Sequence, residues 1–267
     1  YRPLPDPRTA DDARDATSHV TLRGVTARNI RNIDVSFPLG TFTALTGVSG
    51  AGKSTLLSEV LAPVLRDSAR SSVLENDDDP GETPAIDSVS GADVVDRLVQ
   101  ITQKPIGRSP RSCLATYTGL FDRVRKLFAS TPEAEARGWG IGRFSFNVTE
   151  GRCPTCQGEG QIEVELVFLP GSYSPCPDYH GARYNPETLE VTWNGRTIAD
   201  VLDLSVRDAL DFFDEDKNVS RSLRALNAVG LGYLTLGQPA TELSGGEAQR
   251  IKLATELQRA PRGHTVY

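Results

Sequence analysis

Methionine is absent from all 267 residues and the chain begins with Tyr1, so we expect an internal piece of a longer chain or a processed product. Long hydrophobic runs are also absent: none approaches the roughly 18 apolar residues of a membrane-spanning helix, and no charged-then-apolar leader opens the chain. Nothing in the sequence indicates a membrane protein or a secreted one. The 38% of apolar residues is enough to bury one large core or two smaller ones.

Cysteine is scarce, with only Cys113, Cys153, Cys156 and Cys176. Four cysteines could form two disulfides in a small secreted protein. In a chain of this size without a secretion signal, we expect them to stay reduced or to bind metal, and we expect a cytoplasmic protein. Cys113 lies far from the other three in the sequence, and we expect it to be a small buried residue outside any metal site.

Basic residues are few overall but locally concentrated. The formal net charge is −6, yet the segment from Lys104 to Arg152 carries nine Lys and Arg against four acidic residues. The rest of the chain then holds 20 basic and 31 acidic residues. A basic zone inside an acidic protein is compatible with a local nucleic-acid contact.

The first part of the chain is predicted to contain strands. Residues 1–18 are rich in Pro, Asp and Arg and indicate a disordered lead-in. Alternating apolar and polar residues predict strands at 20–27 and 33–37, with a turn at Arg31–Asn32. A third, more apolar strand is predicted at 42–47.

The remaining chain mixes loops, helices and a hairpin. An acidic loop is expected at 72–88, and helical spacing of apolar residues predicts a helix at 117–130. Asn194–Gly195 suits a tight turn and predicts a hairpin within 188–204. Two more helices are predicted, at 206–215 and 220–232.

The segment GVSGAGKS matches the phosphate-binding pattern G-x-x-x-x-G-K-[ST], and it lies after an apolar strand and before a helical stretch. Its glycines let backbone N–H groups turn toward one point, where the start of the helix favours a phosphate. Lys53 would reach the β and γ phosphates, and Ser54 would bind Mg²⁺. The expected nucleotide-binding residues are Gly47, Val48, Ser49, Gly50, Ala51, Gly52, Lys53, Ser54, Thr55 and Gln103.

A second motif, LSGGEAQRIKLATEL, spans 243–257. Ser244 followed by Glu247 forms a capping box, which explains the start of a helix locally. The capping box does not explain the glycine pair Gly245–Gly246, which leaves bare N–H groups at the helix start as a second phosphate-binding end. We expect these four residues to act in nucleotide binding.

LSGGEAQR resembles the signature motif of the ABC ATPases, and the P-loop, Gln103 in ITQKP and the signature stand in that family's order. The resemblance implies that the signature of one module closes over the Mg-ATP that the P-loop of a partner module holds. It also implies that the Walker B strand and catalytic Glu would follow GHTVY, so this piece is expected to bind nucleotide without competent hydrolysis.

The spacing of these motifs narrows the resemblance. Between Gln103 and Leu243 lie 139 residues, far more than a transporter ATPase usually has there. Strings such as RSCLATYTGLFDRVRKLFA, CPTCQGEGQIEVELVFLP and GLGYLTLGQPATELSGGEAQR are similar to the second ATPase half of the UvrA family. The resemblance implies a homodimeric ATPase that recognises distorted double-stranded DNA in nucleotide excision repair and loads a UvrB-type helicase subunit.

The expected fold class is α/β: a P-loop ABC-type ATPase core with an inserted, largely helical signature domain that carries a zinc module. After the lead-in, the domains are expected at 19–112 for the ATP-binding core and 113–242 for the inserted domain, with the zinc module at about 150–184. Residues 243–267 would hold the signature helix and the start of the Walker B region. The expected cofactors are ATP, Mg²⁺ and Zn²⁺.

The zinc module is predicted from Cys153 and Cys156 in CPTCQGEG and from Cys176, which follows 19 intervening residues later, as in two-pair zinc modules. In the UvrA family the fourth ligand is a Cys where this chain has Tyr179. Three explanations stay open: His180 binds instead and completes a Cys₃His set, three cysteines and water hold the metal, or the site is vestigial. A phenol is a poor ligand because its pKa lies near 10.

Contacts to DNA are expected to reach backbone phosphates, because an enzyme that recognises many lesions reads shape and deformability more than base edges. The candidate residues are Arg108, Arg111, Arg123 and Lys126.

Two alternatives share some of these motifs. A UvrA-like drug-resistance protein that protects DNA from intercalators would share all of them. An ABC transporter ATPase would need a membrane-domain partner and would lack the metal.

Overall fold

The computed structural model describes residues 18–69, 71–73, 84–166, 169–259 and 263–267. The predicted lead-in and most of the predicted acidic loop lie outside these residues. The chain divides into two compact units, Tyr1–Thr102 with Ala260–Tyr267 and Gln103–Arg259. The division falls before the predicted boundary at 112, and the signature helix belongs to the second unit.

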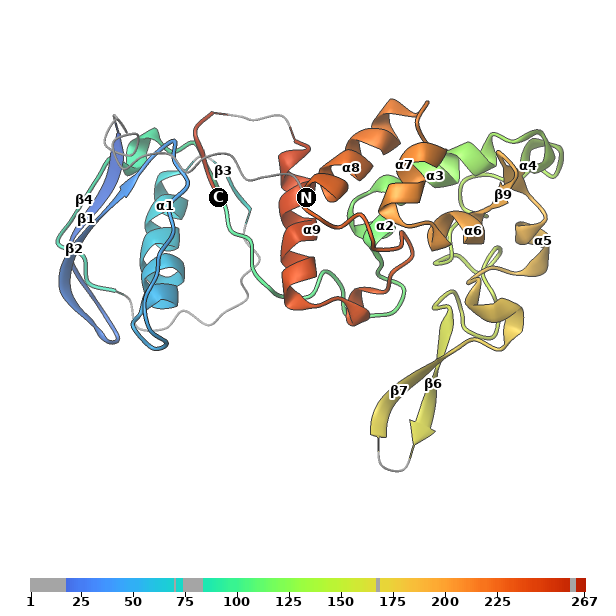
Figure 1. Ribbon diagram of the computed structural model, residues 1–267, viewed down its shortest axis with the longest axis horizontal. Coiled ribbons are helices and arrows are strands. Elements are labelled where there is room, and N and C mark those ends of the chain that lie inside the picture. The colour runs from blue at the N-terminus through green and yellow to red at the C-terminus, as the bar shows by residue number, and fades with distance from the viewer. Residues whose placement is uncertain (1–17, 70, 74–83, 167–168, 260–262) are drawn as a thin grey trace. The chain divides into compact units, whose positions relative to one another are not determined.

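The first unit contains an antiparallel sheet whose strands have the order β2-β1-β4 (Figure 1). Val20 and Leu22 of β1 are buried while their neighbours Thr21 and Arg23 are more exposed, as the alternating pattern predicted. The turn between β1 and β2 lies at Arg28–Asn29 and not at Arg31–Asn32 as predicted. The strands are β1 His19–Ala27, β2 Ile30–Pro38 and β4 Ser88–Ser90.

A second, parallel sheet of the first unit has the order β10-β5-β3. The helix after the P-loop packs its apolar side chains into the same core as β1, with Leu56, Val60 and Leu65 buried there. The elements are η1 Thr55–Leu61, α1 Ala62–Ser68, β3 Ser71–Val73, η2 Ala92–Val94, β5 Arg97–Val99 and β10 Thr265–Val266.

The third strand predicted at 42–47 does not form in the described residues. An apolar run becomes a strand only where a neighbour supplies ladder hydrogen bonds. No strand of the described residues pairs with this segment, and Phe42 is 97% exposed.

The second unit contains eight α-helices within the described residues. Side-chain N-caps start most of its longer helices, for example Asp216 on α8, whose carboxylate accepts the N–H groups of Asn218 and Val219. The helices are α2 Leu114–Tyr117, α3 Leu120–Ala129, α4 Pro132–Ala136, α5 Pro186–Leu189, α6 Ile198–Asp203, α7 Val206–Phe212, α8 Lys217–Ala228 and α9 Gly245–Leu257, with short 3₁₀ turns η3 Asp178–Gly181 and η4 Ala240–Glu242.

Two hairpins interrupt the helices of this unit. The hairpin β6 Gln161–Leu166 and β7 Leu169–Pro175 extends away from the helices (Figure 1). The hairpin β8 Thr192–Trp193 and β9 Arg196–Thr197 turns at Asn194 and Gly195, which have φ of 48° and 75°, as predicted. Its strands are shorter than expected because α5 and α6 occupy the flanking residues.

Among the described residues, no helix has the length and apolarity needed to cross a bilayer.

Buried aromatic side chains form part of the core of the second unit. Phe146 stacks on Phe121 with ring centroids 5.1 Å apart and meets the edge of Tyr184 at 6.1 Å. The hydroxyl of Tyr184 donates a hydrogen bond to the backbone oxygen of Phe144 at 2.8 Å. This bond ties the segment after the cysteines to the segment before them.

Replacing Tyr184 by Phe removes that buried hydrogen bond and leaves the Phe144 carbonyl without its donor. We expect the free energy of unfolding to fall by about 1 kcal/mol. Urea denaturation followed by circular dichroism measures the change. Tyr173→Phe on the exposed side of β7 is the matched control, and an equal loss in both variants would contradict the assigned role of the bond.

Candidate nucleotide and metal sites

The three glycines of the P-loop have positive φ. Gly47, Gly50 and Gly52 have φ of 151°, 79° and 88°, in the region that favours glycine. The side chain of Asn29, in the β1–β2 turn, donates to the backbone oxygen of Gly50 at 2.7 Å. A side chain at Gly52 would come within 3.0 Å of Ile30. The turn between the first two strands thus holds the loop in place.

Lys53 folds back over this loop. Its Nζ donates to the backbone oxygens of Gly47 at 2.9 Å and Val48 at 2.7 Å. Ser54 is exposed at the start of the helix, and Thr55 is buried behind it. The ammonium group is therefore held against the backbone at the start of the loop.

Gln103 and the signature motif lie together in the second unit. A Cβ added to Gly245 would stand 3.2 Å from the Cβ of Gln103. The backbone at Gly245 therefore packs closely against Gln103, and a larger residue would crowd it. The buried Lys252 of α9 donates its Nζ to the backbone oxygen of Lys104 at 2.7 Å. Gly246, by contrast, has open space where a side chain would project. Gly246 is also exposed, whereas Gly245 is partly buried.

The predicted capping box forms at the start of α9. The N–H of Glu247 donates to Ser244 Oγ at 3.3 Å, and the N–H of Ser244 donates to Glu247 Oε2 at 2.8 Å. The hydroxyl of Tyr233 donates to the other carboxylate oxygen of Glu247. Arg250 donates to the backbone oxygens of Gly246 at 3.4 Å and Val229 at 3.3 Å. The motif is fixed both by its own helix and by the end of α8.

These hydrogen bonds favour the charged form of Glu247. The Tyr233 hydroxyl, followed by the N–H and hydroxyl of Ser244, lowers the pKa of the Glu247 carboxyl. The bond to Glu247 in turn raises the pKa of Tyr233. The negative charge sits at the N-terminal end of a helix, where the helix dipole also stabilises it.

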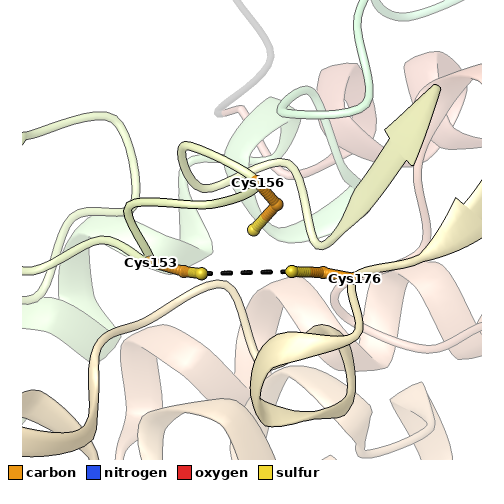
Figure 2. Close-up of side chains that lie close together, drawn as sticks. All are labelled: Cys153, Cys156 and Cys176. Carbon is orange, nitrogen blue, oxygen red and sulfur yellow. Dashed lines mark hydrogen bonds between the residues drawn. The ribbon is translucent and has the colours of Figure 1, made fainter.

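Cys153, Cys156 and Cys176 form the only group of three or more possible metal ligands within the described residues (Figure 2). Their sulfurs lie within 4.8 Å of one another, and all three side chains are buried. Cys153 Sγ and Cys176 Sγ are 4.0 Å apart. Sulfurs bound to one tetrahedral zinc at about 2.3 Å stand about 3.8 Å apart. The Cys153–Cys176 distance is close to this value, and the 4.8 Å bound on the whole group exceeds it by about 1 Å.

Backbone N–H groups point at these sulfurs. Gly160 donates to Cys156 Sγ at 3.3 Å. Burial disfavours the thiolate of Cys153, but the N–H groups of Cys156 and Thr155 outweigh that cost and lower its pKa. Burial raises the pKa of Cys176 to about 11, and the nearby Cys156 adds to this effect. A divalent cation would remove the repulsion that keeps the second thiolate from forming, so the donor set fits zinc.

His180 does not join this cluster. Its side chain is exposed and lines a polar cavity of about 270 Å³ together with Arg183, Asp203 and Glu242. Tyr179 is 44% exposed. The prediction that His180 is the fourth ligand stays a prediction. His180 is not part of the group of possible ligands that the three cysteines form.

The basic candidates are distributed over the surface of the second unit. Arg108 and Lys126 are exposed. Arg111 forms an ion pair with Glu159 at 3.4 Å, and Arg123 pairs with Asp216 at 2.8 Å. Half of the predicted set is thus partly neutralised by acidic neighbours.

Three residues that support these sites escaped the sequence analysis: Asn29, Tyr233 and Arg183. Each acts through a contact to a segment distant in the sequence, and no local pattern marks it. The guanidinium of Arg183 donates to the backbone oxygens of Pro110 and Gly237 at 3.1 Å each and of Gly158 at 3.4 Å. It thereby links the cysteine turn to the segment that leads into the signature.

Comparison with known proteins gives relatives for almost the whole chain. No family model matches. UvrABC system protein A from Streptomyces avermitilis is 53% identical over 268 residues, which are 99% of this chain and 25% of the relative. The same protein from Bacillus subtilis is 51% identical over 267 residues, 100% of this chain and 27% of the relative. The chain spans about a quarter of the length of these curated relatives.

A solved structure is also similar. The crystal structure of UvrA2 from Deinococcus radiodurans matches with a TM-score of 0.84 and 55% identity, over 99% of this chain and 30% of that chain. This match confirms the predicted α/β fold of the UvrA type. It leaves the signature domain and the zinc module as predictions.

The lowered pKa of Glu247 has a consequence for stability. A carboxyl whose pKa is lower in the folded than in the unfolded protein stabilises the fold above its unfolded pKa of about 4.3, and this contribution is lost as the pH falls through the folded value. In Glu247→Gln, an amide oxygen replaces the carboxylate and can still accept the Ser244 N–H. We expect this variant to be less stable than the parent at neutral pH and equally stable in strong acid. Urea unfolding at a series of pH values measures this.

The matched variant is Tyr233→Phe, which removes the largest cause of the shift. We expect the Glu247 carboxyl to titrate at a higher pH in this variant, as seen by NMR of its side chain. An unchanged titration would show that Tyr233 does not stabilise the carboxylate.

Proposed function

Because the chain corresponds to a segment of UvrA, we propose that the whole protein recognises damaged double-stranded DNA in nucleotide excision repair and uses ATP to do so. The observation that carries this proposal is the presence of a P-loop and a capped signature helix in a chain about half identical to UvrA throughout. The relatives favour repair over the drug-resistance alternative and over a transporter ATPase.

The P-loop of this segment would bind ATP with Mg²⁺. Lys53 would exchange its bonds to the loop carbonyls for the β and γ phosphates, because a phosphate is the stronger acceptor for an ammonium. Ser54, exposed at the first turn of the helix, would bind Mg²⁺. Asn29 would keep the loop in its receptive shape.

The signature would act on ATP held by a second P-loop. Gly246 is open, and the Ser244 hydroxyl lies at the same helix start, so both could reach a phosphate oxygen. A homodimer is the arrangement in which two such modules complete each other. Tyr233 and Arg250 would hold the motif rigid, since a phosphate-binding end must be preorganised to bind well.

The second unit would meet the DNA backbone through its exposed basic residues. Arg108 and Lys126 are better placed for this than Arg111 and Arg123, whose charges are partly neutralised. The partners would be duplex DNA and a UvrB-type helicase subunit. The protein would act in the cytoplasm, because bacterial chromosomal DNA lies there.

The three cysteines would bind Zn²⁺ as a structural metal. The buried sulfurs, their spacing and the N–H groups aimed at them support this assignment. Zinc held there would tie the base of the β6–β7 hairpin, since Cys156 precedes β6 and Cys176 follows β7 directly. Arg183 would link this rigid turn to the segment before the signature, since it bonds to the backbone oxygens of both Gly158 and Gly237.

Nucleotide binding is tested by replacing Lys53 with Ala in the full-length protein. Loss of a charge-assisted hydrogen bond of 1.5 to 3 kcal/mol weakens binding by roughly 10- to 100-fold. Equilibrium binding of a fluorescent ATP analogue measures the change. Arg66→Ala removes the same charge from α1 and should bind like the parent, so equal weakening in both would refute the assignment.

DNA binding is tested with Arg108→Ala and Lys126→Ala. We expect each variant to bind all duplex sequences more weakly and to reduce the salt slope of log K by about 1, as one phosphate contact is lost. Fluorescence anisotropy of labelled duplex DNA at several salt concentrations gives the slope. Arg196→Ala, exposed on the β8–β9 hairpin, is the control. A slope unchanged from the parent would remove Arg108 and Lys126 from the interface.

A further inference from the structure

The cysteine module contains the same turn twice. The first copy is Cys153-Pro-Thr-Cys-Gln-Gly and the second is Cys176-Pro-Asp-Tyr-His-Gly. Each copy ends in a glycine with left-handed backbone, Gly158 at φ 89° and Gly181 at φ 83°. The residue before each glycine is also left-handed, Gln157 at 50° and His180 at 52°. The two turns therefore share both pattern and backbone shape.

The hydrogen bonds between the two turns follow the same symmetry. The N–H of Cys153 donates to the backbone oxygen of Arg183 at 2.9 Å, and Arg183 stands seven positions after Cys176. The N–H of Cys176 donates to the backbone oxygen of Gly160 at 3.0 Å, and Gly160 stands seven positions after Cys153. A pseudo-twofold axis thus relates the turns and passes between Cys153 and Cys176.

This symmetry assigns each position its counterpart. Cys156 corresponds to Tyr179, and Gln157 corresponds to His180. Gln157 is exposed and takes no part in the cluster, and His180 is likewise exposed and turned to the cavity. The fourth corner of the metal site therefore belongs to position 179 and not to position 180.

Within this shared shape, position 179 is left-handed and its counterpart is not. Tyr179 has φ of 57°, whereas Cys156 is not among the left-handed residues. A left-handed tyrosine is strained by roughly 1 to 2 kcal/mol, so other contacts of the turn must offset this cost. The rotation accompanies a ring that is 44% exposed while the counterpart Cys156 is 5% exposed. Tyr179 therefore does not take the buried position that Cys156 holds in the first turn, and no fourth ligand among the described residues joins the three cysteines.

We propose that this module holds its metal through three thiolates and keeps the fourth coordination position open to a small exogenous donor. This inference rests on the proposed zinc site and says how that site differs from a closed four-ligand one. Structural zinc sites have four protein ligands, whereas three protein ligands leave a place for water. A small thiol could take that place: it would release its proton to the buffer, and its sulfur would displace the water.

The experiment uses the full-length protein loaded with Co²⁺, whose absorption reports the number of bound sulfurs. Adding β-mercaptoethanol should raise the sulfur-to-cobalt absorption of the parent and of His180→Ala alike. It should leave Tyr179→Cys unchanged, because the fourth thiolate is already present. With zinc loaded, transfer to an excess of a chromogenic chelator should be at least about ten-fold slower for Tyr179→Cys than for the parent.

Each other outcome is decisive. If His180→Ala alters the cobalt spectrum before thiol is added, the imidazole is the fourth ligand and the open position is refuted. If the parent binds no metal but Tyr179→Cys does, the open site is vestigial and the inference fails while the module stands. If neither the parent nor Tyr179→Cys binds metal, and Cys153→Ser gives the same metal content as both, the zinc assignment itself fails. Nucleotide and DNA binding are measured separately and do not depend on these results.

Discussion

The buried guanidinium of Arg183 joins three loop segments of the second unit that are distant in the sequence. It bonds to three backbone oxygens from segments at 110, 158 and 237, and it stacks at 5.2 Å from the Phe146 ring centre. A planar group with five donors is suited to this, because a buried carbonyl without a donor is costly. This one side chain therefore contacts the cysteine turn, the basic segment and the approach to the signature.

The same segments are joined by short pieces of backbone pairing. Cys113 pairs with Pro239, and the N–H of Ala240 donates to the oxygen of Ser112 at 2.7 Å. The chain then enters the signature helix within a few residues. These contacts connect the cysteine module to the signature helix through continuous backbone and side-chain packing, so the two segments are structurally coupled.

Local chemistry explains which features could be predicted from the sequence. The P-loop turn, the capping box of Ser244 and Glu247 and the Asn194–Gly195 hairpin each depend on residues within a few positions of one another. The prediction of a strand at 42–47 was wrong, because a strand forms only beside a partner strand and no local sequence pattern identifies that partner. Asn29, Tyr233 and Arg183 were missed for the same reason: each acts on a segment distant in sequence.

The two cysteine turns are supported by contacts that need no metal. Bonds from Cys153 to Arg183 and from Cys176 to Gly160 fix the two turns to each other through backbone alone. The Arg183 side chain then anchors both turns to the rest of the unit. These contacts hold the turns in place whether or not a fourth ligand is present, so the cysteine cluster can keep its geometry with a tyrosine at position 179.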